Sequence, residues 1–570
     1  MMMSVRLLCA AAVLLGICAC RPNAHEDSPR QERDTAADVF VGGVQYASSG
    51  VGEMDLTVEV LLKNRGRTAV RMAEAELDGI VLPPPPRQNR TQALDAFGVE
   101  GARHEPPRNS PSYLADARWW QFYPSPRIAP GESVVFQLNA VGRARSRQLR
   151  LKTDDGRTLR VTVPPYLPRA RRILHLGVTG DGQEVSVSYS PGLPPLSVTV
   201  NGEAVPFRSL RPADAGRTGA VVAALPAPVQ EGDSLLVELA FPGGATCFGF
   251  VRALLGILTE APDGWDETRP LPRKERNRFG FDETLRIRRL PIDVVCDDAR
   301  AGVCGHSAQT AVAARVFEGR RHPGALCGID FCTALQPSTC PIYAPLADAV
   351  FLKPYRLHWG MSPNRYMDEE VDFVGAWVAA VAPRPVVWIP ERFGGGCGMD
   401  GREFGVLAWS ALVSGVRGIR VHHWMNARAN PFGDNPGLGE AIGRFNAALN
   451  RHRRVLERLI PVGSRTLRRG SVHILEGWCG DAGALLLVRN LDYETGIERK
   501  GGQLNRRHPF AVRTKGGVEI DADVPLWMKP RGACDLLTGA ALDMEEGDGR
   551  IRVRIPELEA FCLVWIPNGR

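Results

Sequence analysis

Beyond its first twenty residues, this chain of 570 residues lacks any apolar run that approaches the roughly 18 residues needed to cross a membrane. It also lacks a CxxC pair and the His/Cys spacing of a zinc site, so we expect no metal site. The sequence contains no P-loop, no dinucleotide-binding fingerprint and no glycine-flanked serine-hydrolase elbow. The sequence therefore predicts a protein without a metal or an organic cofactor.

Aromatic residues are scarce, at 7% of the chain, and they are not interleaved with clusters of basic residues. The net charge of +7 comes from arginines that are spread along the whole sequence. Nucleic-acid-binding proteins usually gather positive charge on one face and add stacking aromatic side chains. We therefore expect no nucleic-acid partner.

The first twenty residues have the composition of an export signal. Residues 1–6 form a short basic segment, and residues 7–17 form an apolar run of signal-peptide length. The run ends in Ile17-Cys18-Ala19-Cys20, which resembles a bacterial lipobox with a small residue before the cysteine that is lipidated. We expect residues 1–19 to be removed, Cys20 to carry a lipid anchor and residues 20–37 to form a flexible tether. The protein would then be an extracytoplasmic, membrane-anchored lipoprotein of the bacterial cell envelope. An ordinary secretory signal cut nearby is the alternative.

Ten of the 13 cysteines follow Cys20. Five of them cluster in the middle of the chain: Cys296, Cys304, Cys327, Cys332 and Cys340. An exported protein meets an oxidising environment, in which cysteines can pair. We expect one or two disulfides in this cluster, and the spacing leaves their connectivity open.

Two consecutive immunoglobulin-like β-sandwiches are predicted at residues 38–168 and 169–246. In the first, four apolar residues recur with the period of two that marks a half-buried strand: Leu56, Val58, Val60 and Leu62. In the second, Asn201-Gly202 lies between alternating apolar residues and predicts a hairpin turn. Residues 131–138 are echoed by residues 232–239, which indicates a weak internal repeat. We expect these modules to act as spacers or packing domains.

From about Cys247 the pattern changes to short apolar runs separated by amphipathic segments, which indicates strands alternating with helices in a parallel sheet. Six strands are expected, at residues 248–258, 292–296, 325–329, 349–352, 386–389 and 419–421. We predict a TIM-like (β/α) barrel over 247–462 and a C-terminal β-sandwich over 463–570. Because a complete barrel has eight strands, either two strands are too polar to recognise or the barrel is incomplete. The expected fold class is multidomain, α/β plus all-β.

Four local stretches of the predicted barrel carry a family resemblance. Residues 343–355 end in Lys353-Pro-Tyr355, and residues 386–394 read VVWIPERFG. Residues 403–419 contain Ala408-Trp409-Ser-Ala-Leu412, and residues 422–424 read His-His-Trp. In this order they resemble the glycoside hydrolases of the large TIM-barrel clan. They resemble more closely the glycosidase-like bacterial lipoproteins in which β-sandwiches flank the barrel. The resemblance covers roughly residues 325–461 and implies an O-glycosidic bond of a poly- or oligosaccharide as the substrate.

Cleavage of a glycosidic bond uses two carboxyl groups, one neutral as the proton donor and one ionised as the nucleophile or base. Glu391 and Asp330 are the best pair, because each directly follows or ends an apolar strand run. In (β/α) barrels the chemistry lies at the C-terminal ends of the strands. We predict that Glu391 is the nucleophile or base and Asp330 the proton donor, with Asp297 and Asp298 in reserve. The alternatives are an ion pair of Glu391 with Arg392, a loop cap at Asp330 and a helix start at Asp297-Asp298.

The residues predicted to contact the sugar also lie near strand ends. An aromatic face suits the C–H-rich face of a sugar ring, so we expect Trp424 to stack on the substrate. His422, His423, Asn426 and Tyr355 are expected to contact the substrate, as are the reserve carboxylates. Packing in the mouth of the barrel is the alternative role for the tryptophan and the two histidines.

A second class of function stays open. In the resembling families the middle strand typically ends in Asn-Glu or Asp-Glu-Pro, whereas Gly328-Ile-Asp330-Phe-Cys332 has one carboxylate and no glutamate. The alternative is a non-catalytic surface lipoprotein whose degenerate barrel binds glycan or scaffolds a complex.

Overall fold

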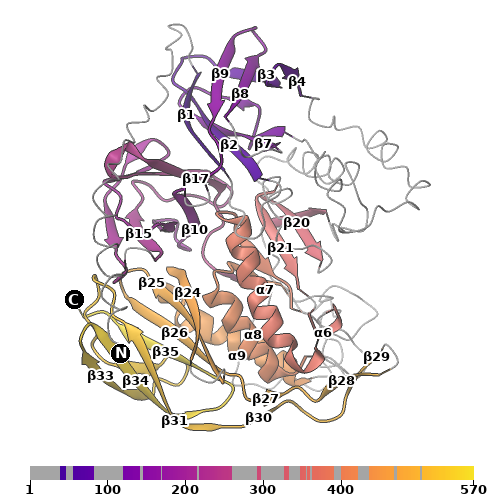
Figure 1. Cartoon of the computed structure of the whole chain (residues 1–570), viewed down its shortest axis with the longest axis vertical. Helices are drawn as coiled ribbons and strands as arrows, with labels where there is room; N and C mark the ends of the chain where they lie inside the picture. The colour runs from indigo at the N-terminus through magenta and orange to yellow at the C-terminus, as the bar shows by residue number, and fades with distance from the viewer. Residues whose placement is uncertain are drawn as a thin grey trace, which may run out of the picture. The chain divides into compact units, whose positions relative to one another are not determined.

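A computed structural model describes residues 39–46, 56–82, 120–140, 146–167, 170–214, 217–259, 292–296, 326–332, 347–354, 356–359, 362–390, 399–420, 436–467, 471–500 and 503–569. All of these residues belong to one compact unit, Val39–Arg570. Strands dominate the unit and form several separate sheets, with a group of helices in its later half (Figure 1). The chain is therefore a β-rich multidomain protein.

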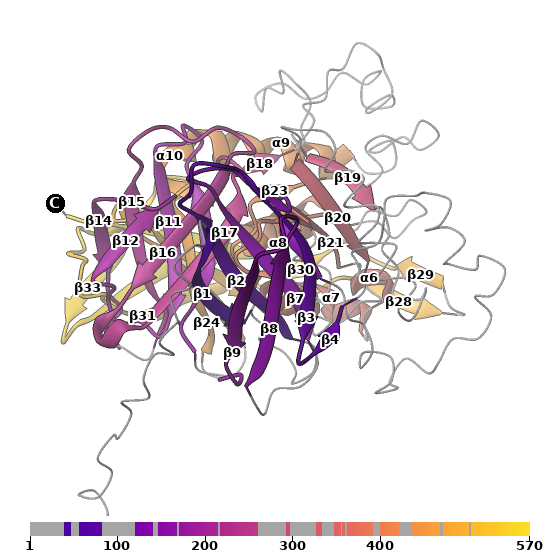
Figure 2. The same ribbon diagram turned by 90° about the horizontal axis from the view of Figure 1, so that it is seen from above.

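The first module consists of two antiparallel sheets around an apolar core, drawn in indigo and violet in Figure 2. One sheet has the order β1 (Val39–Tyr46), β2 (Leu56–Asn64), β7 (Ser133–Ala140), β5 (Trp120–Tyr123). The other has the order β4 (Ile80–Val81), β3 (Val70–Leu77), β8 (Arg147–Thr153), β9 (Thr158–Val163), and β6 (Arg127–Ile128) also pairs with β3. Val58, Val60 and Leu62 point into the core between the sheets, as their period of two predicts.

The opposite face of β2 is buried as well. Glu59 accepts hydrogen bonds from the side chains of Gln137 (2.9 Å) and Gln45 (3.0 Å). Lys63 forms a 2.6 Å ion pair with Glu238 of the second module. Glu59 is therefore satisfied within its own module and Lys63 contacts another domain, whereas the sequence pattern alone suggested a solvent-facing side.

The second module also has two antiparallel sheets. One sheet has the order β10 (Arg172–Val178), β11 (Glu184–Ser190), β15 (Gly219–Ala224), β14 (Phe207–Leu210). The other has the order β13 (Glu203–Ala204), β12 (Ser197–Val200), β16 (Ser234–Ala240), β17 (Thr246–Arg252). The short helix η1 (Pro242–Gly244) precedes β17. The hairpin turn predicted at Asn201-Gly202 is confirmed, because both residues have positive φ and Val200 pairs with Glu203 across the turn.

Strand β17 differs from the sequence expectation for residues 248–258. It pairs antiparallel with β16 and belongs to the second module, so the expected start of the barrel at Cys247 falls inside this strand. Cys247 and Val251 pack in the core of the second module, whereas Phe248 and Phe250 pack against the first module. An antiparallel strand that is buried on both faces has the same continuous apolar run as a strand of a parallel sheet. The two kinds of strand therefore could not be distinguished in the sequence.

The middle of the chain forms one sheet of six parallel strands. Its order is β18 (Leu258–Thr259), β23 (Gly418–Ile419), β22 (Val386–Trp388), β21 (Ala349–Lys353), β20 (Leu326–Cys332), β19 (Ile292–Cys296). All five pairings are parallel, so the predicted alternation of strand and helix is confirmed in its sheet. Strands β19 to β23 follow the chain order, and the first strand, β18, lies beside the last.

A closed barrel is not shown by these strands. Within the described ranges β18 and β19 do not pair, and the sheet is open between them. The observed element is therefore an all-parallel, six-stranded sheet.

Helices cover the outer face of this sheet. They are α6 (Arg356–Trp359), η4 (Pro363–Arg365), α7 (Tyr366–Val381), α8 (Gly401–Val413), α9 (Pro436–Arg451) and α10 (Arg453–Leu456), and α7, α8 and α9 lie beside one another in Figure 1. Helix α8 begins with a capping box, in which the Asp400 side chain accepts from the Glu403 amide and the Glu403 side chain accepts from the Asp400 amide. Among the described residues, no helix combines the length and the hydropathy that a membrane span requires.

The last module is an antiparallel sheet of eight strands. Its order is β24 (Leu459–Leu467), β25 (Val472–Cys479), β26 (Gly483–Asn490), β35 (Phe561–Pro567), β32 (Ala533–Asp535), β33 (Ala541–Gly547), β34 (Arg550–Leu558), β31 (Lys515–Asp523). Two short antiparallel pairs accompany it: β27 (Tyr493–Glu494) with β30 (Ala511–Val512), and the hairpin of β28 (Ile497–Lys500) with β29 (Gln503–Arg506). Ile474 and Val488 from one half of the sheet pack with Ile520 and Val553 from the other, so the sheet folds over its own core.

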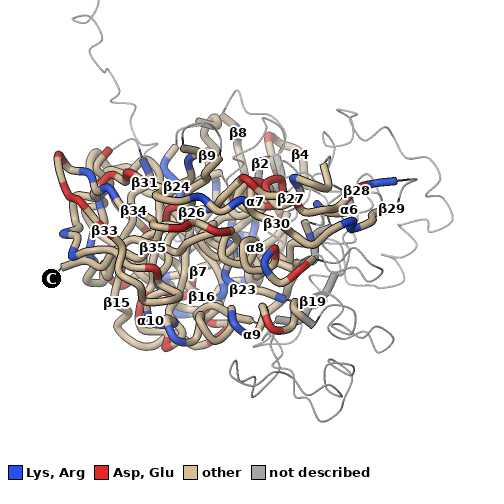
Figure 3. Tube along the Cα trace, turned by 90° about the horizontal axis from the view of Figure 1, so that it is seen from below, with Lys and Arg blue, Asp and Glu red and all other residues tan. Residues whose placement is uncertain are grey.

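Charged residues of both signs are mixed along the described chain (Figure 3). Several of them pair across modules, for example Arg208 with Asp481 at 2.7 Å and Arg458 with Glu184 at 2.6 Å. These contacts connect the second module to the C-terminal part of the chain.

Candidate functional site

The carboxyl edge of the parallel sheet is the candidate site, because the ends of parallel strands and their following loops meet at one edge. The inner face of the sheet is apolar up to this edge. It is formed by Leu254, Leu258, Leu326, Ala349, Phe351, Val387 and Ile389. An apolar floor with polar groups at its rim is the usual composition of a small-molecule site.

Two basic residues lie at this edge. Lys353 is the last residue of β21, and only 4% of it is exposed. Arg420 directly follows β23, its amide donates to the Trp388 carbonyl (2.9 Å), and its guanidinium lies 5.6 Å from the centre of the Phe351 ring. Both residues have interaction partners. The sequence assigned neither residue a role. Lys353 directly follows the expected strand 349–352, which is the kind of signal that selected Glu391, whereas Arg420 falls inside the expected strand 419–421.

Asp330 lies within β20 near the same edge. Its backbone pairs with Phe351 of β21, and Cys332 pairs with Lys353 two residues later in the same direction. The structure thus brings the positions of Asp330 and Lys353 onto neighbouring strands, close to the strand ends. The side chain of Asp330 is outside the described part of the chain.

The other residues predicted for the site lie outside the described residues. They are Glu391, Trp424, His422, His423, Asn426, Tyr355, Asp297 and Asp298, and the predicted lipidation residue Cys20 lies outside them too. In sequence, the described strands β22 and β23 end three residues before Glu391 and five residues before Trp424, at Trp388 and Ile419 respectively. The predicted constellation stays a prediction.

A buried carboxyl group lies behind β22, on the outer face of the sheet. The indole Nε1 of Trp388 donates to Oε1 of Glu370 in α7 over 2.9 Å. Burial raises the pKa of Glu370 to about 8, and this residue is only 1% exposed. Its Oε2 has no hydrogen-bond partner among the described residues. Glu370 therefore holds the C-terminal end of β22 in place as a neutral acid at neutral pH, away from the inner face.

A second buried carboxylate anchors α8 to the C-terminal part of the chain. Glu403 pairs with Arg506 at 2.7 Å while it also caps the helix at Asp400. Burial raises the pKa of Glu403 to about 7, and Arg506 opposes this shift. Because all of its contacts are structural, Glu403 positions the helix that follows the 391–398 loop in sequence.

The described residues also bear on the metal and disulfide expectations. Within the described ranges, no three His, Cys, Asp or Glu side chains gather as a metal site would require. Cys247, Cys479, Cys534 and Cys562 are free thiols. The side chains of the five clustered cysteines lie outside the described part, so the disulfide prediction stays open.

No protein-family model and no curated protein matches this chain. Solved structures that resemble it include an alpha-L-fucosidase from Bacteroides thetaiotaomicron, with 8% identity, a TM-score of 0.22 and coverage of 46% of this chain and 72% of the fucosidase. A maltogenic alpha-amylase from Thermotoga neapolitana has 10% identity and a TM-score of 0.27, over 44% of this chain and 58% of the amylase. An alpha-fucosidase from Thermotoga maritima has 10% identity and a TM-score of 0.21, over 48% of this chain and 75% of that one. These neighbours are glycoside hydrolases, matched at low identity over part of each chain.

Proposed function

We propose that this chain is an exported, glycoside hydrolase-like protein that cleaves an O-glycosidic bond of a poly- or oligosaccharide at the carboxyl edge of its parallel sheet. The observation that carries the proposal is the strand order, in which β19 to β23 run in sequence and β18 lies beside β23. This is the order of a (β/α) barrel, in which the first strand neighbours the last. A TIM-like barrel is therefore part of the proposal, with the substrate at the strand ends.

The proposed mechanism uses Glu391 and Asp330 on opposite sides of the scissile bond. Glu391 acts as nucleophile or base and must be ionised, whereas Asp330 must carry the proton that it delivers to the leaving oxygen. Lys353 and Arg420 supply two positive charges at the strand ends. Nearby cations lower the pKa of a carboxyl group, so this charge would favour the ionised form that the nucleophile or base requires. Lys353 lies on the strand beside Asp330, however, and there it opposes the protonated form that a proton donor requires.

Sugar recognition is proposed for the loops after the strands. Trp424 would stack on the sugar ring, and His422, His423 and Asn426 would bind its hydroxyls. The apolar inner face that ends at Phe351 and Ile389 supports this assignment, since it leaves polar contacts to the loops. Tyr355, Asp297 and Asp298 are proposed as further contacts from neighbouring strand ends.

A non-catalytic glycan-binding or scaffolding lipoprotein is the second candidate. It is favoured by the segment 328–332, which has one carboxylate and no glutamate. It is also favoured by the cations Lys353 and Arg420 at the strand ends, because nearby positive charge opposes the protonated carboxyl group that a proton donor requires. In either case the lipid anchor at Cys20 would hold the protein at a membrane outside the cytoplasm.

A screen for turnover and binding separates these candidates. The purified chain is incubated with aryl-glycosides and with plant, algal and bacterial polysaccharides, and new reducing ends are measured. Isothermal titration with the same glycans measures binding. Release of reducing ends supports a hydrolase, and binding without turnover supports the second candidate. If no glycan is cleaved and none is bound, both candidates are contradicted.

Asp330→Asn then tests the assignment of the proton donor. A proton donor matters most when the leaving group is a poor one, so the variant should lose about 10²-fold or more on alkyl or sugar leaving groups. It should lose far less on dinitrophenyl glycosides, whose leaving group departs without protonation. An equal loss on both substrates would reject Asp330 as the proton donor.

A further inference from the structure

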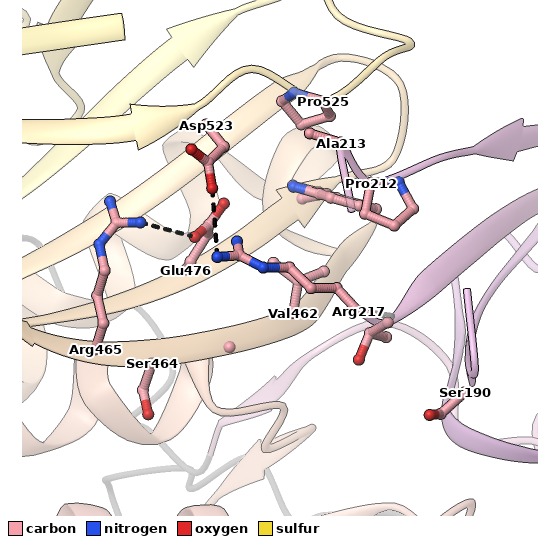
Figure 4. A pocket seen from close by; sticks show the side chains of 13 residues that line it. Ser190, Pro212, Ala213, Arg217, Val462, Ser464, Arg465, Glu476, Asp523 and Pro525 are labelled. Carbon is pink, nitrogen blue, oxygen red and sulfur yellow. Dashed lines mark ion pairs between the residues drawn. The ribbon is translucent and has the colours of Figure 1, made fainter. Parts of the chain in front are cut away.

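A polar cavity lies between the second module and the C-terminal sheet, separate from the strand ends of the parallel sheet. Its volume is about 290 Å³, at the lower end of small-molecule sites. The lining comes from residues 212–213 and 217–218 between β14 and β15, from Ser190 of β11, from β24 and β25, and from the end of β31 (Figure 4). None of the sequence motifs discussed above falls in this cavity.

A β-bulge shapes one wall of the cavity. The pairing of β24 with β25 shifts between Pro461 and Gly463, so Val462 is the extra residue, and it lines the cavity. Ser464 and Arg465 follow directly and line it as well. Bulges of this kind redirect side chains and are frequent next to binding sites.

The charges that line the cavity are already paired. Arg217 and Asp523 lie 3.3 Å apart, and Arg465 and Glu476 lie 3.9 Å apart, as the dashed lines in Figure 4 show. Asp523 also accepts from the guanidinium of Arg550 (3.1 Å). Two cationic and two anionic side chains therefore line the cavity, which gives no preference for a ligand of either charge.

Hydrogen-bonding groups at the cavity are left unused. The Nε of Arg465 and the indole Nε1 of Trp478 are buried and have no hydrogen-bond partner among the described residues. Both residues line the cavity, and Trp478 is 3% exposed. Buried polar groups without partners are uncommon because each costs free energy. Burial raises the pKa of Glu476, and the neighbouring Arg465 opposes this shift.

We propose that this cavity binds a neutral sugar unit and serves as a second carbohydrate site. Paired charges present donors and acceptors without a net field, which suits a ligand with many hydroxyl groups and no charge. Trp478, Val462 and Pro525 supply apolar surface for the C–H groups of a ring. The inference shares its ligand class with the proposed function, but it does not require catalysis at the strand ends.

The test uses the full chain and three neutral probes, cellotriose, maltotriose and xylotriose. Binding is measured by saturation-transfer NMR and isothermal titration. Ser464 is exposed at the cavity, so Ser464→Phe fills the space without disturbing the core, and Arg465→Met removes the unused donor at similar length. Thr466→Phe is the matched control, because it adds the same ring two residues further along β24, outside the cavity lining.

We expect at least one neutral probe to bind, and each cavity variant to weaken that binding about tenfold or more. Thr466→Phe should bind as wild type does. The absence of binding by every neutral probe, or equal binding by Ser464→Phe, would overturn the inference. So would binding of only charged probes, for which glycylglycine and trigalacturonate are included.

Hydrolysis of aryl monoglycosides keeps the two proposals distinguishable. It reports on the strand ends alone, so Ser464→Phe should leave it unchanged, while Glu391→Gln should leave binding in the cavity unchanged. If hydrolysis is absent but cavity binding follows the variants, only the proposed function fails. If hydrolysis is present and Ser464→Phe binds normally, only this inference fails.

Discussion

Trp388 at the end of β22 donates its indole hydrogen to the buried carboxyl of Glu370 in α7, over 2.9 Å. This bond joins the strand that precedes the proposed nucleophile to the helix layer behind it. Because Glu370 is only 1% exposed and its pKa is raised to about 8, the acid stays protonated at neutral pH. The strand end therefore depends on a neutral carboxyl group, which has a consequence for the pH dependence of stability.

Glu370→Gln should change the pH dependence of unfolding. The folded protein holds this proton up to about pH 8, whereas the unfolded chain releases it near its ordinary value of 4.5. Wild-type stability should therefore fall as pH rises from about 4.5 to about 8, because the folded state binds more protons. The glutamine variant lacks this loss, so it should be more stable than wild type at pH 9, by on the order of 5 kcal/mol, and not at pH 4.5.

Urea unfolding at the two pH values measures this difference, with exposed Glu557→Gln as the control. Other acids titrate equally in both proteins, so the difference between variant and wild type isolates Glu370. If the free energy of unfolding of the variant differs from that of wild type by the same amount at pH 9 and at pH 4.5, Glu370 is ionised in the folded protein.

Tyr123→Phe should loosen the contact between the first module and the parallel sheet. The Tyr123 hydroxyl donates to Oδ1 of Asp348 over 2.6 Å, and Arg252 approaches Oδ2 at 3.3 Å. Both Tyr123 and Asp348 are almost fully buried, so removal of the donor should destabilise the protein by about 1–3 kcal/mol. Guanidinium unfolding measures the effect. Tyr46→Phe, whose hydroxyl bonds to the Pro164 carbonyl in an exposed position, should cost much less.

Gly256→Ala should be more damaging than an ordinary glycine substitution. Gly256 has φ +64°, and a Cβ there would lie 2.7 Å from Oε1 of Glu457. Gly202 also has positive φ, but nothing lies within 4 Å of its Cβ position, so Gly202→Ala reports the backbone strain alone. We expect Gly256→Ala to lower the thermal midpoint further than Gly202→Ala does. Equal midpoints would mean that Glu457 moves aside without cost.

The parallel sheet was predictable because its strands are short apolar runs bounded by charged or glycine-rich segments. Strands β19 to β23 lie within or close to their expected ranges. The range 248–258 was different, since β17 is buried on both faces by two modules and its composition matched a parallel strand. Burial by a neighbouring domain leaves no periodic signal in the sequence.

The same limit applies to the site. Charged residues at strand ends can be recognised in sequence, and Lys353 met that criterion as well as Glu391 did. Arg420 did not, because the expected strand 419–421 enclosed it and only the structure ends β23 at Ile419. Contacts between distant segments cannot be recognised in this way. Tyr123 and Asp348 are 225 positions apart in the sequence. The hydrogen bond between Glu370 and Trp388 likewise depends on how α7 packs against β22, which the sequence does not show.

Cys20→Ala should release the protein from the membrane fraction. The prediction rests on the segment Ile17-Cys18-Ala19-Cys20, in which Cys20 follows a small residue and is the proposed site of lipidation. In a bacterial host, radioactive palmitate should label the wild type and Cys18→Ala but not Cys20→Ala. A Cys20→Ala protein that stays labelled and membrane-bound would place the anchor elsewhere.

The central claim is that carbohydrate chemistry takes place at the carboxyl edge of the parallel sheet and uses Glu391. A nucleophile or base that is replaced by its neutral amide can neither attack the sugar nor accept a proton. The matched control is Glu559→Gln, which makes the same change at an exposed position in the C-terminal module.

The most direct test is kcat/KM of the wild type, Glu391→Gln and Glu559→Gln on the glycoside that the screen identifies. We predict that Glu391→Gln loses at least about 10²-fold in kcat/KM, while Glu559→Gln keeps the wild-type value. A Glu391→Gln protein that retains the wild-type rate would contradict the account.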